Sequence, residues 1–81
     1  MKANFTDWIA LSQDYSIAES RVPKKWLGKS LKELDIRKEY GVSVVGLKEN
    51  SRVEVNPDPD EKLNENMILI LIGANKELQK I

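Results

Sequence analysis

Met67-Ile68-Leu69-Ile70-Leu71-Ile72-Gly73 is the stretch that decides the fold predicted for this chain. Its side chains are apolar up to the closing glycine, so a strand made from it is covered on both faces. Such a strand lies inside a sheet and not at its edge. The apolar run is also far shorter than the roughly 20 residues that span a bilayer, so no membrane insertion is expected.

Three further segments have strand character and surround this central strand in the prediction. Residues 15–23 end in Pro23, which cannot donate to a sheet ladder, so the strand there stops or lies at an edge. Residues 42–47 and 52–55 are rich in valine, and the polar Lys48-Glu49-Asn50-Ser51 separates them. This spacing predicts a β-hairpin with a short loop.

Two helices are indicated by their ends. Ser30-Leu31-Lys32-Glu33 is a capping box, in which the serine oxygen and the glutamate side chain satisfy each other's backbone amides. Gly41 stands where a left-handed cap would end the helix, so one helix is expected over residues 30–41. A last helix is expected to begin at Asn75, whose side chain is suited to capping.

The N-terminal segment also has helical spacing. Phe5, Trp8 and Ile9 fall at i, i+3 and i+4, which predicts a short amphipathic helix over residues 4–11. Such a short helix has little core of its own. Its bulky stripe therefore packs on this domain, on a partner chain or on a neighbouring domain.

The expected order is helix, strand, helix, strand, strand, strand and helix, so the fold class is α+β, a small β-sheet with flanking helices. The 81 residues make one small domain. A domain of this size buries only about 60% of the surface of its unfolded chain. Association with another subunit would add stability, so the small size favours a dimer.

The composition excludes several classes of function. Cysteine and histidine are both missing, which removes thiolate nucleophiles, catalytic triads and the common zinc sites. The 13 basic and 13 acidic side chains cancel, so no net charge favours a nucleic acid polymer. The sequence contains no phosphate-binding glycine motif and no secretory signal. We expect an intracellular protein that is not an enzyme and holds no cofactor.

A cluster of three carboxylates follows the hairpin, at Asp58, Asp60 and Glu61. Oxygen ligands of this kind suit hard cations such as calcium or magnesium. Lys62 follows directly, however, and no glycine shapes a binding loop. The favoured interpretation is a solvated acidic turn, and no metal site is predicted.

A basic patch surrounds Trp26, formed by Lys24, Lys25 and Lys29. One interpretation is a surface on which a base stacks while the lysines meet phosphate. The favoured one is that Trp26 covers the sheet while the lysine heads stay in water.

Arg37 is the preferred anion ligand of the chain. It places a planar, permanently charged fork near the end of the predicted helix, beside Asp35. The alternative is an ordinary surface ion pair with Asp35 or with Asp60. The segment Asn56-Pro57-Asp58-Pro59-Asp60 is stiffened by its two prolines, which predicts a rigid wall and not a flexible linker.

Three motifs in order resemble one known family, the RCK C-terminal or TrkA-C domain. They are residues 26–42, residues 56–60 and the strand of residues 67–73. The resemblance covers residues 15–81. Residues 6–12 before it are similar to Ktr-type regulatory subunits of bacterial potassium uptake channels. By this resemblance, residues 1–14 form a linker helix that follows a missing nucleotide-binding N-lobe.

The resemblance implies a homodimer that binds cyclic di-AMP in the cleft between its copies and reports it to the gating ring of a membrane potassium channel. The ligand has two phosphates and a two-fold axis, which matches an isologous interface. The implied alternative is a dimerisation or regulatory module of another cation transporter or antiporter that binds no nucleotide. By either implication the domain is cytoplasmic and peripheral to the membrane through its transporter partner.

The family site carries over to eight positions of this sequence. An apolar wall for adenine, a cation at the helix start, and groups that meet phosphate and base edges are implied. From relatives that bind cyclic di-AMP, an asparagine is expected at position 43 and a histidine at position 52, where this chain has serine and arginine. The implied ligand-binding residues are Leu31, Lys32, Asp35, Arg37, Ser43, Val44, Arg52 and Pro59.

Overall fold

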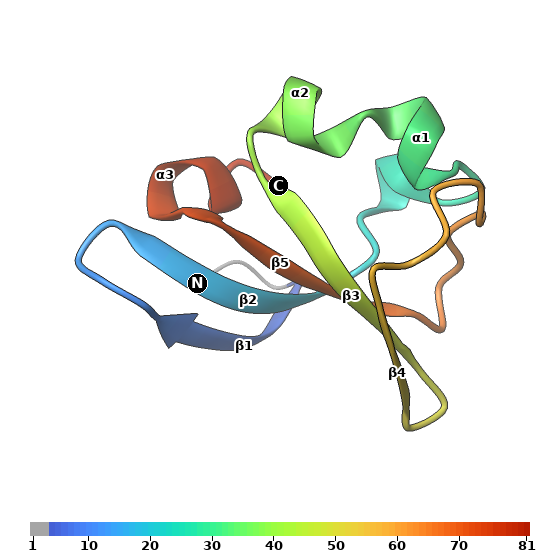
Figure 1. Ribbon diagram of the computed structural model, residues 1–81, viewed down its shortest axis with the longest axis horizontal. Coiled ribbons are helices and arrows are strands. Elements are labelled where there is room, and N and C mark those ends of the chain that lie inside the picture. The colour runs from blue at the N-terminus through green and yellow to red at the C-terminus, as the bar shows by residue number, and fades with distance from the viewer. Residues whose placement is uncertain (1–3) are drawn as a thin grey trace.

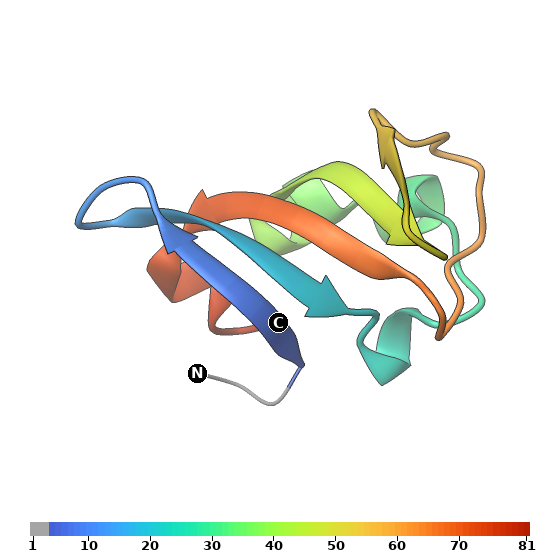
Figure 2. The same ribbon diagram turned by 90° about the horizontal axis from the view of Figure 1, so that it is seen from below.

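The computed structural model describes residues 4–81, and within them five strands form one antiparallel sheet. The strand order is β1-β2-β5-β3-β4, and Figures 1 and 2 show the sheet as a twisted surface with short helices beside it. The predicted α+β class is confirmed. The elements are β1 (Phe5–Ala10), β2 (Tyr15–Arg21), the 3₁₀ helix η1 (Lys24–Trp26), α1 (Leu31–Leu34), α2 (Ile36–Tyr40), β3 (Ser43–Glu49), β4 (Arg52–Val55), β5 (Ile68–Ala74) and α3 (Asn75–Leu78).

The strand predicted at the centre of the sheet is confirmed. β5 lies between β2 and β3 and is paired along its whole length with β2. Leu69 and Leu71 are completely buried on one face, and the isoleucines that alternate with them are half-buried on the other. The continuous apolar pattern therefore correctly indicated an inner strand, with a neighbouring strand on each edge.

The hydrophobic core lies on the face of the sheet that carries the helices. Trp26 has no exposed surface, and its ring meets the ring of Tyr40 edge-on at 5.0 Å between centroids. The three lysines around Trp26 are exposed, so the favoured interpretation of this segment is confirmed. The other large side chains of the core include Ile36, Val42, Leu47, Leu63, Met67, Leu78 and Ile81.

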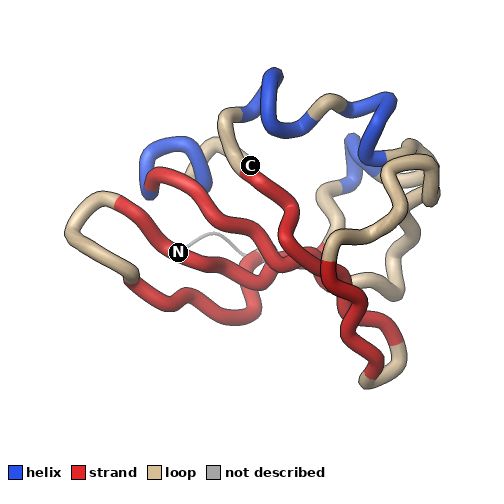
Figure 3. Tube along the Cα trace, in the orientation of Figure 1, coloured by secondary structure: helices blue, strands red, loops and turns tan. Residues whose placement is uncertain are grey.

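The helix predicted over residues 4–11 is wrong, because Phe5–Ala10 forms the edge strand β1, paired with β2 (Figure 3). A β-bulge between Phe5 and Asp7 explains the misleading spacing. The extra residue brings Phe5 and Trp8 to the same face, where their rings meet edge-on at 5.0 Å. Ile9 points to the other face and is 54% exposed. Residues 1–3 of the predicted linker lie outside the described residues.

The helix predicted over residues 30–41 begins and ends as expected but is broken in the middle. Asp35 adopts the left-handed conformation with φ 47°, and it separates α1 from α2. Gly41 forms the predicted left-handed cap with φ 72°. The break therefore divides the predicted helix into two short helices, α1 and α2, that follow one another instead of forming one rod (Figure 1).

The predicted β3–β4 hairpin is confirmed, with Glu49 opposite Arg52 at its closed end. Asn50 and Ser51 make the turn, and both have positive φ, 53° and 70°. This is the backbone of a type I′ turn, which matches the twist of the strands. The last helix, α3, has Ala74 at its N-cap and not Asn75.

The side chain of Asn75 does not cap α3 but makes two hydrogen bonds to other parts of the chain. Its Oδ1 accepts a hydrogen bond from Ser16 Oγ at 2.6 Å, and its Nδ2 donates to the carbonyl of Gln13 at 3.1 Å. The Asn75 side chain therefore holds the β1–β2 hairpin against the start of α3 and is not available as a cap. This explains why the prediction of the cap failed although the helix was predicted correctly.

Candidate functional site

The turn of α1 gathers three of the expected site residues. Ser30 Oγ accepts the Glu33 amide at 3.1 Å, and Glu33 Oε1 accepts the Ser30 amide at 3.0 Å, so the predicted capping box is confirmed. Asp35 closes the turn by donating its amide to the carbonyl of Leu31 at 2.9 Å. Leu31, Lys32 and Asp35 consequently lie together on one fixed turn.

The proline-containing loop is tied to α1. The Lys32 amide donates to the carbonyl of Pro59 at 2.8 Å, and Lys62 Nζ lies 3.2 Å from Glu33 Oε1. The hydrogen bond from the Ser30 backbone, followed by the Lys62 ammonium, lowers the pKa of the Glu33 carboxyl below its ordinary value. These contacts fix Pro59 beside Leu31 and Lys32.

Arg37 stands on the exposed side of α2. Its neighbour Ile36 is buried and anchors the helix to the core, while Arg37 is exposed. Within residues 4–81 Arg37 makes no ion pair, so the alternative of a pair with Asp35 or Asp60 is wrong for this structure. The guanidinium fork is open to an anion from solvent.

Ser43 and Val44 begin β3, next to the end of α2. Val44 is partly buried against the core, and Ser43 pairs with Ile72 of β5. β4 pairs with β3 only from Gly46 to Glu49, so the first residues of β3 extend beyond it. A ligand at this end therefore has access to a strand edge as well as to side chains.

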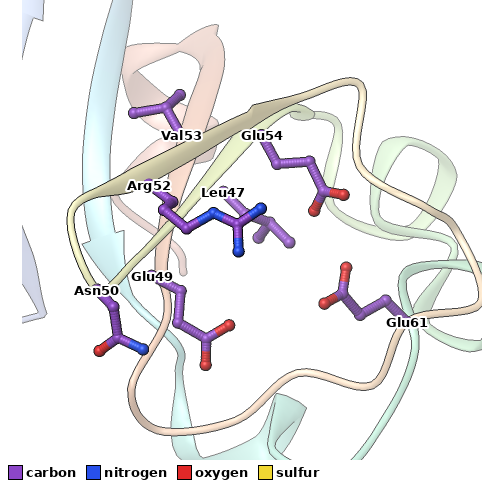
Figure 4. A pocket seen from close by; sticks show the side chains of 7 residues that line it. All are labelled: Leu47, Glu49, Asn50, Arg52, Val53, Glu54 and Glu61. Carbon is purple, nitrogen blue, oxygen red and sulfur yellow. The ribbon is translucent and has the colours of Figure 1, made fainter.

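Arg52 lies apart from the other seven expected residues. Ser43 and Glu49 stand at opposite ends of β3, about 20 Å apart at 3.3 Å per residue, and Arg52 faces Glu49. Its side chain lies in a groove of about 310 Å³, together with the carboxylates of Glu49, Glu54 and Glu61 (Figure 4). The structure does not bring Arg52 to Ser43 within one chain.

The acidic groove is a grouping that sequence reasoning missed. Burial and then the neighbouring Glu54 carboxylate raise the pKa of the Glu61 carboxyl above its ordinary value. Asp58 instead uses Oδ1 to accept the Asp60 amide at 2.9 Å, which makes a tight acidic turn. In the described part of the chain no three acidic side chains are placed to hold a metal ion. The predicted hairpin could have indicated this grouping, because pairing of β3 with β4 brings Glu49 opposite Arg52.

The family model of the TrkA-C domain matches residues 17–81. The chain belongs to the TrkA-C domain family. The Ktr system potassium uptake protein C of Bacillus subtilis (strain 168) is 32% identical over 77 residues. That match takes in 95% of the chain but 35% of the relative. The K(+)/H(+) antiporter subunit KhtT of the same organism is 40% identical over 58 residues, which are 70% of the chain and 35% of the antiporter subunit.

Solved structures agree with this assignment. The KtrA RCK C domain in complex with cyclic diadenosine monophosphate matches this TrkA-C domain with a TM-score of 0.76 and 33% identity, over 82% of this chain and 78% of that chain. The GsuK RCK domain matches with a TM-score of 0.78 and 29% identity, over 90% of this chain and 16% of that one. The domain thus spans about a third of the length of its curated relatives. Along residues 4–81 no helix is long and apolar enough to cross a membrane.

Proposed function

We propose that this TrkA-C domain is a non-enzymatic sensor within a regulatory subunit of a bacterial potassium transporter, and that it binds cyclic di-AMP between two copies of itself. The observation that carries the proposal is Arg37, which is exposed and makes no ion pair within residues 4–81, near the turn that holds Leu31, Lys32 and Pro59. The likeness to a KtrA domain in complex with this ligand supports it.

The chemistry of the ligand suits these residues. Cyclic di-AMP carries two phosphates and two adenines around a two-fold axis, and an isologous dimer repeats each of its residues around such an axis. Arg37 of each copy meets one phosphate as a charged hydrogen-bond donor. Leu31, Val44 and Pro59 supply apolar surface for the adenines. Lys32, Asp35 and Ser43 supply a cation, an acceptor and a hydroxyl at the rim.

The proposed mechanism is a shift between two arrangements of the dimer. A ligand that touches both copies binds better when they stand at one particular separation. It can bias a transporter only by this difference in affinity between the two arrangements. In this proposal the membrane-embedded transporter subunit is reached through the full-length protein, on the cytoplasmic side.

Titration calorimetry of the domain with cyclic di-AMP tests the proposal. A charged hydrogen bond contributes about 1.5 kcal/mol, and two copies of Arg37 act on one ligand, so Arg37→Ala is expected to weaken binding about 100-fold. Lys38→Ala removes an exposed neighbouring charge from the same helix and is the matched control. No heat from the wild-type domain, or equal affinity for Arg37→Ala and Lys38→Ala, contradicts the proposal.

A second candidate function has its own support. The identity of 40% to an antiporter subunit favours a dimerisation or regulatory module of another cation transporter. In this candidate function the module binds no nucleotide. Serine and arginine at positions 43 and 52, where asparagine and histidine were expected, point in the same direction. A domain that is dimeric by sedimentation but silent towards cyclic di-AMP in calorimetry would establish this candidate over the first.

A further inference from the structure

A second cleft lies between the β1–β2 loop and α3, at the end of β5 that leads into this helix (Figure 1). Its volume is about 510 Å³, which is within the range of about 300–1,000 Å³ found for small-molecule sites. None of the eight residues expected at the cyclic di-AMP site lines it. The residues that line this loop–helix cleft are Asp14, Tyr15, Ala74, Asn75, Lys76 and Gln79.

The two walls of the loop–helix cleft are held together by Asn75. Its amide donates to the carbonyl of Asp14 at 2.8 Å, and its Nδ2 donates to the carbonyl of Gln13 at 3.1 Å. Its Oδ1 accepts from Oγ of the buried Ser16 at 2.6 Å. Three hydrogen bonds from one residue thus fix the loop against α3. Because the walls are already in place, a ligand orders little of the chain when it binds.

The two charged side chains of the cleft come from different walls. Asp14 belongs to the loop and Lys76 to α3. Within residues 4–81 neither makes an ion pair, with the other or with any further group. Gln79 follows Lys76 by three residues and therefore lies on the same side of the helical turn. The cleft offers a carboxylate on one wall, and an ammonium with an amide on the other.

Tyr15 supplies the aromatic surface of the cleft. It is 55% exposed, and it is the residue of β2 that pairs with Ala74 at the end of β5. Its position at this end of the sheet places it next to the start of α3. An exposed aromatic ring at a cleft can pack against a ring or an aliphatic group of a ligand. The third feature of the cleft is therefore apolar.

We propose that the loop–helix cleft binds a free α-amino acid with a large apolar side chain. The ammonium group of the ligand meets Asp14, its carboxylate meets Lys76 and Gln79, and its side chain packs on Tyr15. A zwitterion suits this cleft because it brings a partner to each unpaired charge. A simple anion would be attracted by Lys76 but repelled by Asp14. The proposal does not depend on the binding of cyclic di-AMP.

An NMR titration of the isotope-labelled protein with L-phenylalanine, in the absence of cyclic di-AMP, tests this proposal. A Kd of about 2 mM is expected for a ligand of this size at ordinary ligand efficiency. The backbone amides of residues 14–15 and 74–79 are expected to shift and to saturate together. N-acetyl-L-phenylalanine lacks the ammonium charge and L-phenylalaninamide lacks the carboxylate. Each is expected to bind about fivefold more weakly than the free amino acid.

Charge removal in the protein gives a second measurement. Asp14→Asn and Lys76→Gln are each expected to weaken L-phenylalanine binding about three- to fivefold. Lys80→Gln is the matched control, because Lys80 pairs with Glu77 at 3.6 Å and does not line the cleft, so wild-type affinity is expected. Three results overturn the proposal: no saturable shifts at the cleft amides, equal binding of the blocked analogues, or wild-type affinity in both Asp14→Asn and Lys76→Gln.

Discussion

The surroundings of Arg37 and Arg52 make the most instructive contrast in this molecule. Both are exposed arginines that make no ion pair within residues 4–81, and both were expected at one anion site. Arg37 stands on α2 beside the start of β3. Arg52 stands at the far end of that strand, in a groove with three glutamates. The same type of side chain thus stands on a helix in one place and among carboxylates in the other.

The contrast teaches that residue type does not define a site. A guanidinium group attracts phosphate only where the field of its neighbours allows it. Around Arg52 the field is dominated by Glu49, Glu54 and Glu61. Arg37 lies on α2, which follows the turn of α1, where the Lys32 amide donates to the carbonyl of Pro59.

The largest expected difference is in ligand affinity. Arg52→Ala is expected to leave cyclic di-AMP affinity within about threefold of wild type, whereas Arg37→Ala is expected to weaken it about 100-fold, because in the proposed site only Arg37 meets phosphate. Calorimetry on both variants measures this ratio. If Arg52→Ala loses as much as Arg37→Ala, the two arginines serve one site and the contrast is broken.

Backbone substitutions near the two ends of β3 are expected to act in opposite directions on stability. A Cβ at Gly73 would lie 2.8 Å from Val42 Cγ1, next to the start of β3, so Gly73→Ala is expected to cost about 1–3 kcal/mol. Ser51→Gly relieves a left-handed turn residue at the other end and is expected to stabilise by up to about 1 kcal/mol. Urea unfolding of both variants measures the two free energies. A Gly73→Ala variant as stable as wild type, or a destabilised Ser51→Gly variant, would contradict the cause given for that position.

The smallest expected effect is a pH dependence from the acidic groove. The pKa of Glu61 is raised, so the folded chain keeps that proton at a pH where the unfolded chain has lost it. Its contribution to stability is present below the ordinary pKa of 4.5 and is lost as pH rises through the raised folded pKa. The melting temperature of Glu61→Gln is therefore expected to rise relative to that of wild type as pH rises towards neutrality.

Glu33→Gln is the control of opposite sign. The pKa of Glu33 is lowered, so its contribution to stability is present above the ordinary value of 4.5 and is lost as pH falls through the lowered folded pKa. The melting temperature of Glu33→Gln is thus expected to fall relative to that of wild type as pH rises. If the stability of the two variants relative to wild type changed with pH in the same direction, the opposite pKa shifts of Glu33 and Glu61 would be contradicted.

Much of the fold was predictable because its signals are local. The central strand, the β3–β4 hairpin, the capping box of Ser30 and Glu33 and the glycine cap at Gly41 each depend on residues within a few positions of one another. Of the seven site residues around α1 and β3, Arg37 was named from its charge and position and the others from a family resemblance, and their role as a ligand site stays a prediction.

The sequence by itself determined where the chain is apolar on both faces and where helices start and stop, since side-chain periodicity and capping act over one or two turns. The tertiary structure alone decided that residues 5–10 are a strand, because pairing with β2 and a bulge at Phe5 gave two aromatic side chains one face. It also decided that Arg52 lies among glutamates far from Ser43. Such neighbourhoods depend on contacts between segments that are distant in the chain, and no local pattern encodes them.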